Sequence, residues 1–356
     1  MLKLSVSEVS KYIELAFKQR KPLFLHGAPG IGKSSVVLQA AERIKVAEGV
    51  SEFFVKDVRL SQMDPTDLGG LPIPVDTNTG KAMGRIYPDW WPTGNEFGII
   101  FFDELNKGTP STQAAAYQLI LDRRMGDREL SPNVMIVAAG NRSSDNVTVY
   151  DMDSALQNRF PMHIEVEVPT KDELEKYFTS IGKNDMKIFG FWNFSERSIF
   201  RYDDKGADPS WASPRSWEFL ADLLELTTEF PKAERMRELK NLAVSAVGDV
   251  VGREFAAYTR LNETVDIDKI LDNPKLFSEI EQPDVKHSVI TEIADRYKRN
   301  KSLQNKAIDF VFGVTELPEY VMLTLSMFSK ANKNFVQKVM EHKDGGKLAE
   351  HMEKFI

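Results

Sequence analysis

A run of glycines that ends in Lys33 and Ser34 has the composition and spacing of a loop that binds phosphate. Glycine has no Cβ, so such a loop can adopt positive φ angles and turn its N–H groups toward a polyphosphate. The Lys33 ammonium can reach the β- and γ-phosphates, and the Ser34 hydroxyl can ligate Mg²⁺. The residues expected to bind nucleotide are Gly27, Ala28, Pro29, Gly30, Ile31, Gly32, Lys33, Ser34 and Ser35.

The segments on either side of this phosphate loop (residues 27–34) agree with that interpretation. A short apolar run, 23–25, precedes the loop and predicts a strand, whereas residues 35–41 predict a helix. The N-terminus of such a helix points its positive dipole end and unpaired N–H groups at a bound anion. A glycine-rich turn with a solvated lysine is the alternative, and it is less consistent with the order strand, turn, helix.

A second chemical feature stands at the end of the apolar run 98–102, where Asp103 and Glu104 follow. Such a run predicts a strand buried on both faces of a parallel sheet, and ligands bind such sheets at the carboxyl ends of the strands. Asp103 is expected to hold Mg²⁺ through its water shell. Glu104 is expected to orient and deprotonate an attacking water. An apolar run that ends in Asp-Glu is a weak motif when it stands alone. It becomes a strong motif here because it follows a phosphate loop by about 70 residues.

Three further polar residues are singled out by their positions in the chain. The strand predicted at 134–139 is followed by Asn141, whose amide would emerge beside Asp103 and contact the γ-phosphate or the water; a turn-forming asparagine is the alternative. Arg159 stands just before another predicted strand, 162–168. Arg215 falls in the first turn of a helix, where the dipole does not favour a cation, so it is expected to have an anionic partner; a surface salt bridge is the alternative.

Bulk properties describe a globular protein. The 356 residues are enough for two or three domains, and 42% hydrophobic with 28% charged residues is typical of such proteins. The net charge of −7 argues mildly against a nucleic-acid coat protein. The absence of cysteine excludes disulfides, thiolate metal sites and cysteine nucleophiles. No signal peptide and no membrane-spanning run are recognisable, so a cytoplasmic location is expected.

The segment 61–93 interrupts the regular pattern with proline, glycine and aspartate. A hairpin turn is predicted near residues 78–81, and a loop of this length inside a domain is usually functional or disordered. Its aromatic residues argue against disorder. Trp90 and Trp91 are expected to cap the core, and the alternative is a protruding loop that grips a partner or substrate.

The predicted fold is of the α/β class. Strands are expected at 23–26, 53–59, 98–104, 134–139 and 162–168, with helices between them. Strand signals stop near residue 182, and the remainder of the chain is predicted to be helical. The most basic stretch, 296–301, is interpreted as a solvated helix end, with nucleic-acid contact as the alternative.

The order of these features resembles the AAA+ ATPases, and among them the MoxR and dynein-related branch. The likeness covers roughly residues 5–260, and its more specific parts are the segment 64–69 and the run from Asp103 to Lys107 that continues to Gln113. The resemblance implies a P-loop NTPase core at 1–182 with a parallel five-stranded sheet, the insert 61–93, and an all-helical lid at 183–265. Residues 266–356 are expected to form a helical C-terminal extension.

The resemblance also implies a role for each candidate residue. The phosphate loop corresponds to the Walker A motif, Asp103 and Glu104 to Walker B, and Asn141 to sensor 1. Arg159 corresponds to an arginine finger supplied to the ATP of the neighbouring subunit, and Arg215 to the sensor-2 arginine of the lid. Lys107 and Arg142 depart from the pattern of the family, in which arginine and proline are usual at these positions.

The function implied is that of a Mg²⁺-dependent ATPase that forms a homo-oligomeric ring, expected to be a hexamer, and remodels or activates a protein partner. Partners of such ATPases often carry a von Willebrand factor A domain. One alternative is a nucleic-acid motor or loader, with Lys81, Trp90 and Trp91 contacting the strand. A second alternative is a nucleotide-gated binding module with little turnover.

Overall fold

The computed structural model describes residues 1–92, 94–126, 128–142, 145, 150, 152–202, 208–231, 233–261, 265–346 and 348. The chain forms two compact units, Met1–Thr170 and Lys171–Ile356. Thr93, the last residue of the predicted insert, lies outside the described residues.

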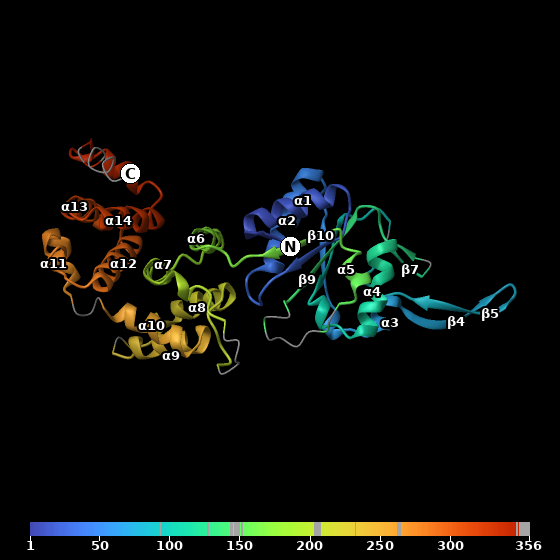
Figure 1. Cartoon of the computed structure of the whole chain (residues 1–356). Coiled ribbons are helices and arrows are strands. Elements are labelled where there is room, and N and C mark those ends of the chain that lie inside the picture. The colour runs from blue at the N-terminus through green and yellow to red at the C-terminus, as the bar shows by residue number, and fades with distance from the viewer. Residues whose placement is uncertain are drawn as a thin grey trace. The chain divides into compact units, whose positions relative to one another are not determined.

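The first unit is built on a parallel sheet with the strand order β1-β10-β2-β9-β6-β3 (Figure 1). The strands at its centre carry near-continuous apolar runs and are buried along most of their length, as expected for strands covered on both faces. The α/β class and the parallel sheet predicted from the sequence are therefore confirmed. The bounds are β1 Leu2–Leu4, β2 Leu23–His26, β3 Phe54–Arg59, β6 Gly98–Asp103, β9 Val134–Gly140 and β10 Met162–Val166.

The sheet has six strands, so the predicted number of five was wrong. The additional strand is β1, which pairs with β10 through Leu2 opposite Ile164 and Leu4 opposite Val166. It has three residues, of which only Leu4 is buried. A segment this short carries no recognisable alternation, and it becomes a strand because the edge of β10 offers it hydrogen bonds.

Helices cover both faces of this sheet (Figure 1). Helices α1 (Val6–Lys18) and α2 (Lys33–Glu48) pack against each other on one face. Helix α4 (Pro110–Asp122) lies on the other face, and its buried residues Ala116, Leu119 and Ile120 share one hydrophobic cluster with Phe24, Ile100 and Phe102 of the strands. A short helix, α5 (Ser154–Gln157), precedes β10. This arrangement places the carboxyl ends of β2, β6 and β9 at one open edge.

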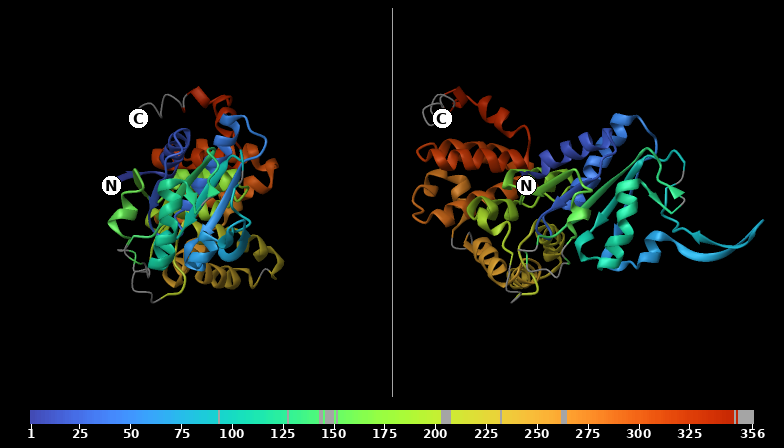
Figure 2. Two further views of the ribbon diagram at one scale, coloured as in Figure 1. Left: turned by 90° about the vertical axis from the view of Figure 1, so that its right-hand side faces the viewer. Right: turned by 45° about the vertical axis from the view of Figure 1, so that its right-hand side comes forward.

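The insert contains an antiparallel hairpin that follows the short helix α3 (Pro65–Gly69). Strand β4 (Leu71–Thr77) pairs with β5 (Gly80–Ile86), and Gly80 has a φ of 120°, which only glycine adopts readily. The predicted turn near residues 78–81 is therefore confirmed. Most hairpin residues are exposed, and Figure 2 shows that the hairpin extends away from the sheet. A small second hairpin follows α4, with strands β7 (Arg124–Met125) and β8 (Arg128–Glu129).

The two tryptophans of the insert lie at the base of this hairpin rather than at its tip. Trp91 is only 4% exposed and belongs to the cluster of Phe102 and Leu119, and Trp90 is half-buried against the same cluster. The ring centroids of Trp90 and Trp91 are 6.0 Å apart, a distance typical of aromatic pairs in cores. The expectation that these residues cap the core is confirmed, while the hairpin itself protrudes.

Trp91→Ala is expected to lower the free energy of unfolding by roughly 3–5 kcal/mol, because it removes a large buried side chain and leaves a cavity. Trp90→Ala is expected to cost clearly less, since part of that side chain is already exposed. Chemical denaturation of both variants and the wild type measures the difference. Equal midpoints for Trp91→Ala and the wild type would contradict the core role of Trp91.

The second unit is helical in all its longer elements. Its core is rich in aromatic side chains, among them Phe178, Trp192 and Trp217. No helix in the described part of the chain is both long and apolar enough to span a membrane. The bounds are α6 Lys171–Ser180, α7 Met186–Phe194, α8 Pro214–Leu226, α9 Arg235–Val247, α10 Asp249–Arg260, α11 Ile267–Asp272, α12 Pro283–Arg299, α13 Gln304–Gly313, α14 Pro318–Ala331 and α15 Phe335–Met340.

The first unit ends at Thr170, and α6 packs with the helices that follow it. Phe178 of α6 makes an edge-to-face contact with Trp192 of α7 at a centroid distance of 5.2 Å. The helices before and after residue 265 share one hydrophobic core. One continuous hydrophobic cluster includes Phe255 on one side of this position and Ile290 on the other.

Candidate functional site

The phosphate loop joins the end of β2 to the start of α2. Gly30 and Gly32 have φ angles of 78° and 101°, values that favour glycine over residues with a Cβ. A Cβ on Gly27 would lie 2.7 Å from Cδ1 of Ile31 and 3.1 Å from the carbonyl oxygen of Val166, so the loop also needs glycine for space. No side chain caps the N-terminus of the 16-residue helix α2. Its first N–H groups are therefore open to an anion.

Lys33 brings a buried positive charge to this loop. Its side chain is 8% exposed, and its Nζ donates to the carbonyl oxygens of Gly27 at 2.7 Å and Ala28 at 2.9 Å. A third hydrogen bond, of 3.1 Å, reaches Oδ1 of Asn141 at the end of β9. The lysine thus links the loop to the neighbouring strand. These three partners are neutral oxygens.

Ser34 and Asp103 form the second link across the site. The Ser34 hydroxyl, in the first turn of α2, donates to Oδ2 of Asp103 at the end of β6 over 2.9 Å. A hydroxyl and a carboxylate oxygen side by side are ligands that suit Mg²⁺, which also keeps water and phosphate oxygens in its shell. The described residues hold no group of three or more acidic or histidine side chains arranged for a metal ion. Any cation here would therefore depend on oxygens beyond these two.

Glu104 adopts a left-handed backbone conformation, with φ 53° and ψ 37°, directly after β6. Its Oε1 lies 2.5 Å from Nζ of Lys107, and its Oε2 accepts a 3.1 Å hydrogen bond from the Ser61 hydroxyl. Partial burial alone would raise the pKa of this carboxyl, but the Lys107 ammonium, the Ser61 hydroxyl and the Arg59 charge together lower it. Glu104 is thus a carboxylate, and its pairing with Lys107 makes it a weaker proton acceptor.

Asn106 fixes the end of β9 next to Lys33. Its Nδ2 donates to the carbonyl oxygen of Asn141 at 2.7 Å, and its Oδ1 accepts from the N–H of Asn141 at 3.3 Å. A Cβ on Gly140 would lie 2.7 Å from that Oδ1 and 2.8 Å from the Phe24 ring, so glycine is required there. Asn141 is buried, and its orientation is determined by Asn106 on one side and Lys33 on the other.

The structure therefore brings together most of the residues selected from the sequence. Side-chain hydrogen bonds join Lys33 to Asn141 and Ser34 to Asp103, and Glu104 follows Asp103 directly. Sequence reasoning assigned no role to Ser61 or Asn106 and treated Lys107 only as a departure from a family pattern. The spacing of Lys107 three residues after Glu104 was the one local signal for these contacts.

Arg159 is not part of this cluster. It follows α5, and its Nη1 donates to the carbonyl oxygen of Ala155 at 3.1 Å while its guanidinium lies 4.6 Å from the centroid of the Tyr117 ring. Within the described residues it makes no hydrogen bond or ion pair with the phosphate loop or Asp103. Its buried Nε has no hydrogen-bond partner in the same part of the chain. The guanidinium is thus held by Ala155 and Tyr117.

Arg215 lies in the first turn of α8 in the second unit. The helix is capped by Ser213, whose hydroxyl accepts from the N–H of Ser216, and Pro214 occupies the first position, as predicted. Arg215 is exposed, and no ion-pair partner for it is found among the described residues. The predicted anionic partner of Arg215 is therefore not supplied by this part of the chain, and its role stays a prediction.

Arg142 and His26, which both flank the site, have structural partners. Arg142 forms ion pairs with Asp145 at 2.8 Å and Glu165 at 2.9 Å. His26 hydrogen-bonds to His163 of β10, with 2.9 Å between Nε2 and Nδ1. The pKa of His26 is lowered to about 4, chiefly by burial and next by the neighbouring His163. Glu165 opposes this shift, and Lys33 adds a smaller lowering effect. His26 therefore has a side-chain hydrogen-bond partner within the sheet.

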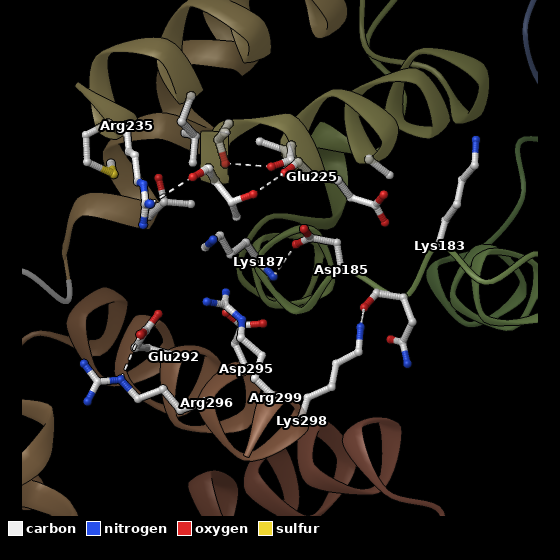
Figure 3. Close-up of a pocket in the computed structure, with 18 of the residues that line it drawn as sticks. Lys183, Asp185, Lys187, Glu225, Arg235, Glu292, Asp295, Arg296, Lys298 and Arg299 are labelled. Carbon is white, nitrogen blue, oxygen red and sulfur yellow. Dashed lines mark hydrogen bonds and ion pairs between the residues drawn. The ribbon is translucent and has the colours of Figure 1, made fainter. Parts of the chain in front are cut away.

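The second unit contains a separate cavity of about 610 Å³ between α7, α8, α9 and α12 (Figure 3). Charged side chains of both signs line it, and several are paired with each other. Arg296 bonds to Glu292 at 2.9 Å and to Asp268 at 2.9 Å, and Arg299 pairs with Asp295. In the basic stretch 296–301, Arg296 and Arg299 thus pair with acidic neighbours, whereas Lys298 and Lys301 donate to the main-chain carbonyl oxygens of Asn184 and Ala331.

Comparisons with known proteins agree with this site. Residues 22–160 match the family model described as an AAA domain of the dynein-related subfamily. A search of curated proteins finds no match.

Solved structures with an overall likeness include RuvB from Thermotoga maritima, at 16% identity and a TM-score of 0.40, covering 78% of this chain and 86% of that one. A putative ATPase from Cytophaga hutchinsonii has 13% identity and a TM-score of 0.36, with 75% and 87% covered. NtrX from Brucella abortus in complex with ADP has 13% identity and a TM-score of 0.37, with 72% and 67% covered. Likenesses of this size carry no information about activity.

The match and the geometry concern the same elements, from β2 with its phosphate loop to the segment of Arg159 just before β10. The similarity to an AAA domain of the dynein-related subfamily therefore lies in residues 22–160, which carry the phosphate loop, Asp103 and Asn141.

Proposed function

We propose that this protein is a Mg²⁺-dependent ATPase that works as a homo-oligomeric ring, most simply a hexamer, and acts on a protein partner. The observation that carries the proposal is a set of two side-chain hydrogen bonds, Lys33 to Asn141 and Ser34 to Asp103, at the uncapped N-terminus of α2. An ammonium, a hydroxyl, a carboxylate and an amide meet there at the point where open N–H groups favour an anion.

The residues of this set fit ATP and Mg²⁺. When bound, Mg²⁺ and ATP supply the transferable phosphoryl group and a divalent charge that neutralises the phosphates. Gly27–Ser35 would hold the phosphates, and Ser34 and Asp103 would hold the cation. Lys33, now bonded to neutral oxygens, is suited to leave them for a charged phosphate oxygen. Glu104 would accept the proton of the attacking water, and Asn141 would orient that water or the γ-phosphate.

The ring and the protein partner are proposed from the family resemblance alone. In this proposal Arg159 reaches the ATP of the neighbouring subunit, and Arg215 contacts bound nucleotide from a helical lid near residues 183–265. Residues 266–356 extend that lid. The protein partner is taken to carry a von Willebrand factor A domain, and the cytoplasm is taken as the location. The protruding β4–β5 hairpin is the part of the insert that suits contact with a partner.

The two alternatives are separable from this proposal. A nucleic-acid motor would need Trp90 and Trp91 for base stacking, and the burial of Trp91 leaves that reading with less support. ATP hydrolysis that rises with added DNA and weakens steeply with salt would favour it. A nucleotide-gated binding module would bind ATP with negligible hydrolysis in the absence of any partner.

Lys33→Ala is expected to weaken ATP binding by about tenfold or more, because a charge-assisted hydrogen bond to phosphate is worth roughly 1.5–3 kcal/mol. Binding of a fluorescent ATP analogue and steady-state phosphate release measure the effect. Lys11→Ala is the control, since Lys11 is an exposed lysine on α1 and its loss changes the net charge equally. Unchanged binding and unchanged turnover in Lys33→Ala would overturn the proposed function.

A further inference from the structure

Two histidines connect the phosphate loop to the segment that carries Arg159. His26 is the last residue of β2, directly before Gly27, and His163 lies on the neighbouring strand β10. Their rings are 2.9 Å apart between Nε2 of His26 and Nδ1 of His163. On the other side of its ring, Nε2 of His163 lies 2.8 Å from the carbonyl oxygen of Gln157. The connection joins residue 26 to residues 157 and 163, which are far from it in sequence.

The chemistry of the last partner determines the direction of this chain of hydrogen bonds. A carbonyl oxygen only accepts, so Nε2 of His163 carries a proton and donates it to the carbonyl of Gln157. In a neutral ring Nδ1 of His163 is then an acceptor, and Nε2 of His26 must donate to it. The His26–His163 and His163–Gln157 hydrogen bonds therefore exist together for only one pair of neutral tautomers. A change of tautomer at one histidine therefore affects the hydrogen bond of the other.

The carbonyl oxygen of Gln157 is one of the anchors of the segment around Arg159. Phe160 is buried, its ring lies edge-to-face on Phe24 at 5.3 Å, and its N–H donates to the carbonyl oxygen of Gln157 at 3.1 Å. The N–H of Arg159 donates to the carbonyl oxygen of Leu156 at 3.1 Å. The Gln157 carbonyl thus accepts from both Phe160 and His163, and it lies two residues before Arg159. Its position influences where the guanidinium is held.

The opposite end of the chain of hydrogen bonds lies at the residue that meets phosphate. Lys33 donates to the carbonyl oxygen of Gly27 at 2.7 Å, and Gly27 follows His26 directly. A lysine that turns to a phosphate leaves this carbonyl without its donor, so the Gly27–Ala28 peptide, one residue after His26, loses a hydrogen bond that holds it. The effect can then pass to His163 and to Gln157 through the two hydrogen bonds.

We propose that His26 and His163 are positioning residues that tie the Arg159 segment to the phosphate loop of the same chain. This rests on the proposed function, in which Arg159 serves the neighbouring subunit. The state of one nucleotide site would then be transmitted to the next site around a ring through the position of Arg159. Neither histidine contacts the reacting atoms in this proposal.

Two substitutions of His163 break different bonds. In His163→Gln the side-chain amide nitrogen replaces Nε2, so the bond to the Gln157 carbonyl is kept and the acceptor for His26 is lost. In His163→Asn the Oδ1 atom replaces Nδ1, so the acceptor for His26 is kept and the donor to Gln157 is lost. His26→Phe removes the donor and keeps the ring that stacks near Phe24. Asn158→Ala is the control, because Asn158 is an exposed neighbour of Arg159.

The first readout is hydrogen–deuterium exchange of segment 154–160, measured with and without ADP as the probe. In the wild type, ADP is expected to change the exchange of this segment. The change should be absent in both His163 variants and in His26→Phe, and present in Asn158→Ala. Without ADP, the exchange should be faster in His163→Asn and near that of the wild type in His163→Gln, which keeps the anchor.

The second readout is steady-state ATP hydrolysis. Each of the three histidine variants is expected to lower kcat about tenfold, the scale of one lost hydrogen bond, while KM for ATP stays near that of the wild type. If a His163 variant does not fold, as judged by its thermal unfolding, His26→Phe tests the same link from the other end.

An ADP response that is missing in the wild type, or retained in all three variants, would overturn the proposal. A protein that shows the response but does not hydrolyse ATP would instead refute the proposed function and leave the link in place. A protein that hydrolyses ATP but shows no response to ADP would refute the link and leave the proposed function in place.

Discussion

Glu104→Gln is expected to bind ATP like the wild type and to hydrolyse it on the order of 10²-fold more slowly or worse, the range for loss of a positioned proton acceptor. The amide has nearly the same shape as the carboxylate and can still accept the hydrogen bond of the Ser61 hydroxyl. It carries no charge for the Lys107 ammonium and takes no proton from water. Binding and turnover are therefore expected to separate in this variant.

The measurement combines equilibrium binding of a fluorescent ATP analogue with phosphate release. Glu42→Gln is the matched control, because Glu42 is an exposed glutamate of α2 and loses the same charge. Turnover of Glu104→Gln at the rate of the wild type would remove Glu104 from the proposed mechanism. Reduced binding would point instead to a role in holding nucleotide.

This variant also gives a means of finding the partner. A protein that binds ATP without hydrolysing it should hold its substrate or partner longer, so proteins captured by Glu104→Gln in the presence of ATP can be read by mass spectrometry. The Lys33→Ala variant is the control, since it should not reach the ATP-bound state. Candidates that appear with both variants are not ATP-dependent partners.

Arg159→Ala is expected to bind ATP and to hydrolyse it roughly 10³–10⁵-fold more slowly, the range for an arginine supplied in trans to a phosphoryl-transfer transition state. Such a transition state gathers charge on the γ-phosphate oxygens, which a guanidinium stabilises. In this chain Arg159 is held against Tyr117 and does not contact the phosphate loop within the described residues. In the proposed function, its contribution to hydrolysis comes through another copy.

Mixing tests this point directly. Arg159→Ala protein has an intact phosphate loop, and Lys33→Ala protein has an intact Arg159, so some junctions of a mixed ring pair the two. The mixture is expected to recover part of the activity that neither variant has alone. Wild-type turnover per subunit should also rise with protein concentration as rings assemble. Arg197→Ala, which removes an exposed arginine of the second unit, is the control.

Two results would contradict the role of Arg159. One is wild-type activity in the Arg159→Ala variant. The other is a turnover per subunit that stays constant on dilution to a monomer, which would mean that one chain holds a complete site. Failure of the mixture to recover activity, with each variant folded and able to assemble, would also argue against a shared site.

The local features of the fold were accessible from the sequence because each is written in consecutive residues. The glycines before Lys33 determine a loop, the apolar run before Asp103 determines a buried strand, and the turn near Gly80 determines a hairpin. The geometry of a parallel sheet then places the carboxyl ends of such strands at one edge. Sequence spacing and that general rule together predicted that Lys33, Asp103 and Asn141 would meet.

Only the tertiary structure decided the contacts between residues that are far apart in the chain. Ser61 meets Glu104, His26 meets His163, and the short strand β1 forms only because β10 offers an edge. The boundary of the first unit likewise follows from the packing of Phe178 on Trp192. Local periodicity records which face of an element is buried, but it carries no information about which distant side chain will lie against it, because that depends on the packing of the whole unit.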